Sequence, residues 1–406
     1  MRLIYQISIY LYYFAVRISS LFNPKAKAWI EGRKNLKWEK FDSHYKKVVW
    51  FHCASLGEFD IGIPLIEKWQ QENPDDVIVV TFFSPSGMQN YQKRNLPIEH
   101  VFYLPLDTPK NAKTFVQTIR PNYVIFVKYE FWAFHLFEAQ KYGAKIFSVN
   151  TLFRKNQMYF KWYGNFYRQI LNSFDHFFVQ NKNSIDLLES IQIKNATISG
   201  DLRFDRVYEN KQKVTSSTLI ENWLEGEKVF IIGSSWPVDD KILFELINSE
   251  RFKQKVIIAP HEINESHIKE IEKLLRVESI RFTDCEDEIN RETKVLILNT
   301  IGHLTNSFQY GDVAYIGGGF TGKLHNILEP AVFGLPILFG PKHDKFPEAQ
   351  LFIDKGFAFE VADIRDFKIK FDSVHRDKKD IESKLLQFIK GQIGVSVRIL
   401  KQIQSN

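Results

Sequence analysis

Short runs rich in valine, isoleucine and phenylalanine recur along the first half of the chain, separated by segments with helical periodicity. Runs of this length and composition predict buried strands, and their alternation with helices predicts strand-helix-strand units in a parallel sheet. The expected strands of this half are residues 48–52, 77–83, 123–127, 145–149, 176–180 and 196–199.

The same alternation restarts in the second half, after a polar segment. The expected strands there are residues 229–232, 255–259, 295–298, 313–316 and 336–339. A chain of 406 residues exceeds the size of about 250 to 300 residues at which single cores stop growing. We therefore expect an α/β protein with two Rossmann-like, doubly wound domains, residues 25–207 and 227–385, joined by a linker with a short helix at 208–226. Ligands of such sheets bind beyond the carboxyl ends of the strands, which predicts a cleft where the two domains face each other.

Composition excludes several classes of function. The hydrophobic fraction of 44% and the charged fraction of 25% are those of an ordinary globular protein. The net charge of +6 is spread along the chain without a basic stripe, which argues against nucleic-acid binding. Cys53 and Cys285 lie far apart, which predicts neither a zinc site nor a disulfide framework and fits a reducing compartment.

The N-terminus departs from the globular pattern. Residues 3–15 are nearly all apolar, Arg17 interrupts the run, and a basic segment follows. The run is short against the roughly 20 residues that span a bilayer, so we expect a membrane-associated helix at residues 1–24 that lies in the interface. No small-residue cleavage site follows it, which favours a retained anchor, and the basic excess after it places the protein on the cytoplasmic side. A buried first helix is the alternative.

Polar residues follow the expected strands of the first half. Ser55 and Glu58 have the spacing of a capping box, which is one complete explanation for both. A glutamate in a first helical turn, kept ionised by the helix dipole and with Gly57 leaving room beside it, is also suited to act as a general base. Ser86 lies in a serine-proline helix start, which can hold an anion or be an ordinary cap, and Glu130 lies among aromatic residues at a strand end, which favours contact with a sugar.

In the second half, a glycine loop follows the expected strand 313–316. Gly317, Gly318, Gly319 and Gly322 predict a phosphate cradle, and a helix starting near Asn326 would add its N-terminus. Glu329 would then hold a ribose diol.

Two other interpretations of the glycine loop stay open. The dinucleotide fingerprint fits the glycine spacing, but the stretch 336–340 lacks the required acid. Asn326 and Glu329 also have the spacing of a cap and its N3 partner. Ser234, at a second serine-proline helix start, His261 and the loop 300–303 follow other strands on the same side.

The ordered set of these segments resembles the family of 3-deoxy-D-manno-octulosonic acid (Kdo) transferases. The segments that carry the resemblance are HCASLGE, TFFSPSG, YEFW, GDLRFD, the Gly233-Ser234 turn, APHE, NTIG, HNILEPA and GLPILFGP. The resemblance implies a GT-B glycosyltransferase that moves Kdo from CMP-Kdo to the lipid A precursor of Gram-negative bacteria, at the cytoplasmic side of the inner membrane. It also implies an acceptor-binding N-terminal domain, a nucleotide-binding C-terminal domain and a last helix, 386–406, that crosses back to the first domain.

The resemblance further implies roles for particular residues. Glu58 would be the base that deprotonates the acceptor hydroxyl, in an inverting transfer that needs no metal and no cofactor. Pro260 and His261 would contact the cytosine, while Glu130 and Arg203 would position Kdo or the acceptor. The other implied nucleotide contacts are Ile301, Gly302, His303, Asn326, Ile327, Leu328 and Glu329, and the other substrate contacts are Ser55, Gly57, Ser86, Ser234 and Gly318.

Several positions depart from the family pattern. Lys128 and Ala133 replace an acid and a proline around Glu130, and His303 stands where a glutamate is expected. The family's Asn-Ala-Arg motif appears as Asn-Thr-Leu at residues 150–152, with the arginine displaced. Two alternatives remain: another GT-B enzyme acting on a nucleotide sugar, such as an epimerase, and a non-catalytic, membrane-associated nucleotide-binding protein in which Glu58 is only a cap.

Overall fold

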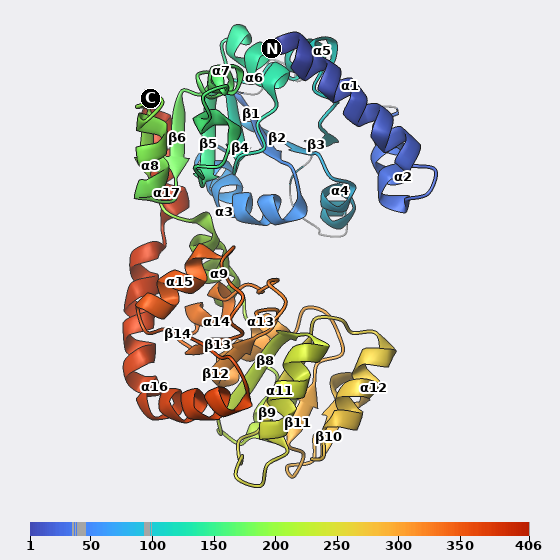
Figure 1. Ribbon diagram of the computed structural model, residues 1–406, viewed down its shortest axis with the longest axis vertical. Helices are drawn as coiled ribbons and strands as arrows, with labels where there is room; N and C mark the ends of the chain where they lie inside the picture. The colour runs from blue at the N-terminus through green and yellow to red at the C-terminus, as the bar shows by residue number, and fades with distance from the viewer. Residues whose placement is uncertain (35, 37, 39–45, 93–97, 99, 406) are drawn as a thin grey trace. The chain divides into compact units, whose positions relative to one another are not determined.

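The computed structural model describes residues 1–34, 36, 38, 46–92, 98 and 100–405. The chain divides into two compact units (Figure 1). The first unit comprises Met1–Arg206 and Gly394–Asn406, and the second comprises Val207–Ile393.

The first unit is built on a parallel sheet, which over the described residues has seven strands in the order β3-β2-β1-β4-β5-β6-β7. The strands are β1 (Val48–Cys53), β2 (Val77–Phe82), β3 (His100–Tyr103), β4 (Tyr123–Val127), β5 (Lys145–Thr151), β6 (His176–Val179) and β7 (Ala196–Ile198). All six expected strands are confirmed, while the edge strand β3 was missed. All of these strands are parallel. Because β1 pairs with β2 on one side and β4 on the other, the order in which the chain adds strands to the sheet reverses between β1 and β4. Such a switch point is where ligands of open α/β sheets bind.

Helices cover both faces of this sheet. They are α3 (Leu56–Glu72), α4 (Pro85–Gln92), α5 (Pro109–Ile119), α6 (Ala133–Tyr142), α7 (Asn165–Leu171) and α8 (Lys182–Glu189), with a 3-10 turn at Met158–Phe160. Along β1, Val49 and Phe51 pack in the core under α3, whereas Val48 and Trp50 pack in the core under α5 and α6. This alternation explains why the strand is a continuous apolar run, as expected of a doubly wound sheet.

The second unit repeats the plan, with a described sheet of seven strands in the order β10-β11-β9-β8-β12-β13-β14. The strands are β8 (Val229–Ser235), β9 (Val256–Pro260), β10 (Ser279–Arg281), β11 (Val295–Ile297), β12 (Gly311–Ile316), β13 (Ile337–Phe339) and β14 (Ala358–Glu360). The helices are α10 (Thr218–Leu224), α11 (Pro237–Ile247), α12 (Glu265–Leu274), α13 (Leu304–Ser307), α14 (Leu328–Val332), α15 (Pro347–Asp354) and α16 (Ile364–Gln392), with 3-10 turns at Phe282–Asp284 and Phe308–Tyr310. The five expected strands are confirmed, and the edge strands β10 and β14 were missed. The order in which the chain adds strands to this sheet reverses between β8 and β12.

Two expected boundaries need correction. Residues 208–226 are not a separate linker, because α9 (Leu202–Gln212) runs through the boundary and the buried Trp223 of α10 donates its indole N–H to the carbonyl of Thr293. The return to the first unit starts at Gly394 rather than at residue 386, since α16 continues to Gln392 in the second unit. The returning helix is α17 (Val395–Ser405), whose apolar side packs in the same core as α3.

The N-terminal helix α1 (Arg2–Ser19) lies on the first unit and is followed by α2 (Pro24–Glu31). Tyr5 of α1 donates a hydrogen bond to the buried Asp107, and Ile9 is the one buried residue of the helix. The exposed large apolar residues of this region are Met1, Leu3, Ile4, Ile7, Tyr10, Leu11, Tyr12, Phe14, Ile18, Leu21 and Phe22. A buried first helix is therefore wrong. No helix in the described part of the chain is long and apolar enough to cross a membrane.

Candidate functional site

The candidate residues form two groups, one at the switch point of each sheet. In the first unit, Glu58 follows β1 and Glu130 follows β4, the two strands that flank the reversal. In the second unit, the loops after β8 and β12 take the corresponding places. Local sequence placed these residues after strands, and the strand order makes the strands neighbours.

Glu58 is both a cap and a partly free carboxylate. The Ser55 hydroxyl accepts the N–H of Glu58 at 3.4 Å, and Oε2 of Glu58 accepts the N–H of Ala54 at 2.6 Å. Within the described residues, Oε1 makes no hydrogen bond. A side chain added at the exposed Gly57 would meet nothing within 4 Å, so there is open space at this residue, directly before Glu58 in the chain. The capping interpretation is therefore correct, and it leaves one oxygen for chemistry.

Burial dominates the electrostatics of Glu58. Desolvation raises its pKa, while Lys128 and the N–H groups of Ala54 and Ser55 oppose the rise. The expected effect of the helix dipole is thus outweighed by burial. Lys128, at a position where the family pattern has an acid, supplies a compensating positive charge, and its left-handed backbone is fixed by an N–H bond of 2.8 Å to the carbonyl of Val149.

Glu130 interacts with Glu58. Burial raises the pKa of Glu130 to about 7, the charge of Glu58 adds to the rise, and Arg33 opposes it. Arg33 was not predicted as a site residue. Its guanidinium lies over the rings of Trp29 at 4.0 Å and Phe83 at 4.8 Å, and donates to the carbonyls of Phe83 and Leu104. The structure therefore adds one fixed cation to the acidic pair.

Arg203 and Ser86 lie elsewhere in the same unit. The Nε and one terminal nitrogen of Arg203 donate to Asp201 at 2.8 and 2.6 Å, which orients the guanidinium at the start of α9. Ser86 is exposed in the first turn of α4, where its Oγ lies 3.2 Å from that of Ser84. Both assignments as substrate contacts remain predictions.

In the second unit, the glycine loop packs against protein rather than lying open. A Cβ on Gly317 would lie 2.2 Å from a carbonyl at the end of β8, and one on Gly319 would lie 2.5 Å from the backbone after β13. Gly318, at φ +90°, donates its N–H to the buried Asp239. These three glycines allow close backbone packing, and the phosphate cradle remains a prediction. Gly322, whose Cβ would have no neighbour closer than 3.9 Å, is the open member.

Asn326 and Glu329 interact directly. Oδ1 of Asn326 accepts the N–H of Leu328, where α14 begins, and its Nδ2 donates to Glu329 Oε1 at 3.1 Å. Thr305 donates to Glu329 Oε2 at 3.3 Å. The expected cap position is therefore one residue off, because Ile327 is the N-cap residue of α14 while Asn326 accepts the first N–H of the helix. Glu329 accepts hydrogen bonds from two neutral donors. Ile327 and Leu328 are buried, and their assignment as nucleotide contacts remains a prediction.

Three rings meet beside this pair. The rings of Trp236 and His261 stack at 4.3 Å, and those of His261 and His325 lie 4.4 Å apart. The indole N–H of Trp236 donates to Nε2 of His325 at 3.2 Å, and the Lys323 ammonium lies 5.1 Å from the Trp236 ring centre. His261 was predicted as a contact, whereas Trp236 and His325 were missed. The sequence signals for them were the Ser-Trp-Pro helix start and the histidine directly before Asn326.

The remaining predicted contacts lie in other surroundings. Ser234, at the end of β8, has a left-handed backbone with φ +55°, and Pro260 is buried at the end of β9. Ile301 is 88% exposed and Gly302 is open, so both are accessible. His303 instead packs against Phe282 at 4.5 Å, in a cavity of about 310 Å³ lined also by residues 215–218.

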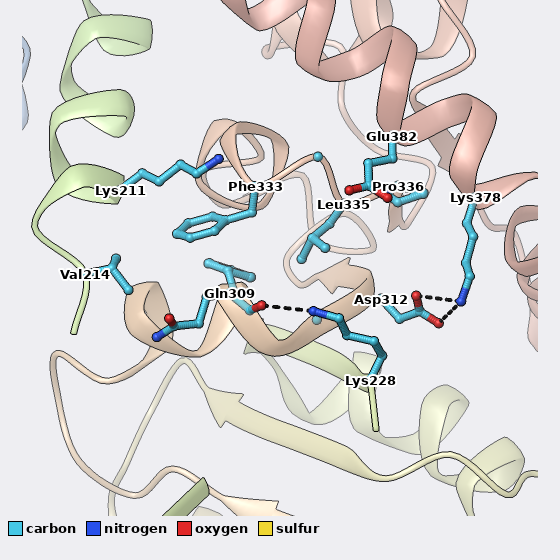
Figure 2. Close-up of a pocket in the computed structure, with 13 residues that line it drawn as sticks. Lys211, Val214, Lys228, Gln309, Asp312, Phe333, Leu335, Pro336, Lys378 and Glu382 are labelled. Carbon is cyan, nitrogen blue, oxygen red and sulfur yellow. Dashed lines mark hydrogen bonds and ion pairs between the residues drawn. The ribbon is translucent and has the colours of Figure 1, made fainter. Parts of the chain in front are cut away.

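Another cavity of the second unit, of about 430 Å³, lies at the amino ends of β8, β12 and β13 (Figure 2). Lys378 pairs with Asp312 at 2.7 Å, while Lys211 and Lys228 donate to backbone carbonyls. Its lysines are thus held by the protein, and it lies at the sheet edge away from the carboxyl ends of the strands. It is not the predicted nucleotide site.

Comparisons with known proteins agree with this arrangement. Residues 29–206 match the family model described as 3-Deoxy-D-manno-octulosonic-acid transferase (kdotransferase). The 3-deoxy-D-manno-octulosonic acid transferase of Chlamydia muridarum is 30% identical over 306 residues, which are 72% of this chain and 70% of that protein. The one from Aquifex aeolicus is 26% identical over 340 residues, 83% of this chain and 88% of that protein.

A solved structure supports the fold. UDP-GlcNAc 2-epimerase from Neisseria meningitidis, bound to UDP-GlcNAc, is similar with a TM-score of 0.63 and 14% identity, over 88% of this chain and 99% of that one. At this identity the likeness shows the GT-B fold alone, with its two parallel-sheet α/β domains. With the sequence relatives and the site residues together, the chain belongs to the Kdo transferase family of glycosyltransferases.

Proposed function

We propose that this protein transfers Kdo from CMP-Kdo to a sugar hydroxyl of a lipid A precursor, with inversion and without a metal ion. The observation that carries the proposal is the state of Glu58. This residue is only 9% exposed and anchored through one carboxylate oxygen, and its other oxygen has no hydrogen bond to the described residues. A buried, fixed carboxylate at the switch point of the acceptor domain is suited to serve as a general base.

In the proposed reaction, Oε1 of Glu58 takes the proton of the acceptor hydroxyl as the hydroxyl oxygen attacks the anomeric carbon of Kdo. The bond from that carbon to the phosphate oxygen breaks, and CMP leaves with the electron pair. A single displacement of this kind inverts the anomeric configuration. The raised pKa of Glu58 makes it a stronger base than an ordinary carboxylate. Glu130, with a pKa of about 7, can exchange hydrogen bonds with the incoming sugar at neutral pH.

The donor would bind in the second unit. The ring of His261, exposed and stacked on Trp236, offers an aromatic surface for cytosine. Both oxygens of Glu329 accept hydrogen bonds from neutral groups, and the two hydroxyls of a ribose can replace these donors. These contacts fit a nucleotide sugar and leave the acceptor to the first unit.

The exposed face of α1 supports a lipid acceptor. Ile4, Leu11 and Ile18 repeat at intervals of one heptad on the helix surface, and Arg17 lies in the last turn of the helix. A helix with such a face lies in the plane of a membrane interface. We propose that the protein acts at the cytoplasmic surface of the inner membrane, where the acyl chains of a lipid A precursor remain in the bilayer.

The test is to incubate the protein with CMP-Kdo and a tetraacylated lipid A precursor, and to weigh the products by mass spectrometry. We expect products heavier by whole Kdo units. Glu58→Gln should keep the fold and lower the rate by orders of magnitude, because an amide cannot take the proton. Glu72→Gln, the same change in the last turn of the same helix, is the matched control. Near-normal turnover by Glu58→Gln would remove the assignment of the base, and an epimerised free sugar as product would favour the other class of GT-B enzyme.

A further inference from the structure

Trp236, His261 and His325 come from three different loops of the second unit. Trp236 follows β8, His261 follows β9 and His325 lies in the loop after β12, so all three are at the carboxyl ends of adjacent strands. The indole of Trp236 and the imidazole of His325 are inclined by 22° and joined by the hydrogen bond of 3.2 Å. His261 packs against both rings.

The hydrogen bond decides which nitrogen of His325 carries the proton. An indole N–H can only donate, so Nε2 of His325 must offer its lone pair. In the neutral imidazole the proton is then on Nδ1. Burial, with a smaller contribution from His261, lowers the pKa of His325 to about 4, so the ring stays neutral at physiological pH. In the described part of the chain, Nδ1 of this half-buried residue has no hydrogen-bond partner.

One buried carboxylate holds both partners in place. Oδ2 of Asp239 accepts the N–H of Trp236 at 2.9 Å and that of Gly318, in the loop that leads to His325, at 3.1 Å. Tyr315 donates to the other oxygen of Asp239. The backbone N–H of His325 donates to the carbonyl of Gly317. These hydrogen bonds hold the loops of Trp236 and His325 against each other, which keeps the indole N–H directed at Nε2 of His325.

We propose that His325 binds an oxyanion of the sugar nucleotide through its neutral Nδ1–H, and that Trp236 is the positioning residue that fixes this tautomer. The inference rests on the proposed function and adds a residue to its donor site. His325 directly precedes Asn326, which pairs with Glu329, so this residue is next in the chain to the pair that includes the proposed ribose contact. Lys323, close to the Trp236 ring, adds positive charge to the same loop. A neutral donor of this kind keeps its proton between about pH 5 and 8, so binding would not depend on the charge of His325.

The tautomer can be measured without a ligand. In the full chain labelled with 15N-histidine, NMR should show His325 as the Nδ1–H form, with its signals assigned by their loss in His325→Asn. Trp236→Phe keeps a ring for stacking but removes the indole N–H, so we expect the Nε2–H form to appear. Trp223→Phe is the matched control, because it removes an indole N–H to a backbone carbonyl in the same unit. An Nε2–H form in the unaltered protein, or an unchanged tautomer in Trp236→Phe, would overturn the proposal.

CMP affinity, measured by calorimetry, tests the role of the donor. We expect Trp236→Phe and His325→Ala each to weaken CMP binding about tenfold or more, which corresponds to about 1.4 kcal/mol. His325→Asn offers an amide N–H close to the position of Nδ1–H and should keep most of the affinity. In that background Trp236→Phe should have no further effect, because Trp236 acts through the histidine tautomer.

The outcomes separate the two proposals. Unchanged CMP affinity in Trp236→Phe and His325→Ala, with normal binding by the unaltered protein, overturns the inference and leaves the proposed function standing. An equal loss from Trp236→Phe in the His325→Asn background also overturns it, since the tryptophan would then act only as a structural residue. Failure of the unaltered protein to bind CMP at all contradicts the proposed donor itself.

Discussion

Charged neighbours act on Glu58 and Glu130 with opposing effects. Lys128 favours the ionised form of Glu58, while the charge of Glu58 disfavours ionisation of Glu130. Arg33, fixed between aromatic rings and carbonyl groups, opposes the rise in the pKa of Glu130. The pair can therefore hold a proton near neutral pH without either carboxyl group being exposed. Glu58 must be ionised to accept a proton during the reaction, and Lys128 favours that form.

Replacing Glu130 should expose the cost of its burial. Its pKa is about 7 in the folded protein against an ordinary value of 4.5, so the fold disfavours the ionised form. The stability that it contributes is present below about pH 4.5 and is lost as the pH rises through 7. Glu130→Gln should therefore raise the free energy of unfolding at pH 8 by on the order of 1 to 3 kcal/mol, with no gain at pH 4.

Denaturant unfolding at both pH values measures this difference. Glu189→Gln, at an exposed position of α8, is the control and should change little at either pH. An equal effect of Glu130→Gln at pH 4 and pH 8 would contradict the raised pKa. A loss of transfer activity together with the gain in stability would support a role for Glu130 at the acceptor site.

At the scale of elements, α1 presents an apolar face that the first unit does not cover. Leu11 and Phe14 are 63% and 61% exposed. We expect the double variant Leu11→Ser with Phe14→Ser to bind anionic liposomes much more weakly in a flotation assay, because it loses two large exposed apolar side chains of the helix. The control variant Leu351→Ser with Ile369→Ser removes two exposed apolar residues of the second unit. Equal flotation of both variants and the unaltered protein would argue against α1 as the membrane contact.

The docking of α17 depends on Asp205. This buried carboxylate accepts the N–H groups of Gly394, Val395 and Ser396 and the hydroxyl of Ser396. Asp205→Ala should cost about 2 to 4 kcal/mol, because several buried donors lose their acceptor at once. Hydrogen exchange of the α17 amides measures the loss.

The matched control is Asp363→Ala, which removes the N-cap of α16. Asp363 is exposed and accepts two N–H groups, so its loss should cost only about 1 kcal/mol. If both alanine variants had equal effects, the anchoring role of Asp205 would be wrong.

At the scale of the whole molecule, the two units have separate cores, so a ligand of one should stabilise that one first. CMP without added Mg²⁺ should slow hydrogen exchange in Val207–Ile393. At a hundredfold excess of CMP over its dissociation constant, the free energy of opening should rise by about 2.7 kcal/mol. Protection confined to the first unit would reverse the assignment of the two domains. A strict requirement for Mg²⁺ would contradict the metal-free transfer.

The strand pattern gave most of the fold correctly, for a physical reason. Strands such as β1 and β8 are buried on both faces of a parallel sheet and must be continuous apolar runs, which are visible in the sequence. The missed strands β3, β10 and β14 lie at sheet edges, are three or four residues long and are partly exposed. Burial does not constrain their composition, so they have no comparable pattern.

The sequence alone determined the local parts of the site, and tertiary structure decided the rest. The contacts of Glu58 with Ala54 and of Asn326 with Glu329 join residues three or four positions apart, and the chain geometry of a helix start brings such neighbours together. The hydrogen bond between Trp236 and His325 joins residues 89 positions apart. Partners of this kind meet only because the strand order places two loops side by side. The pKa of His325 is lowered because other segments of the chain exclude water from its ring.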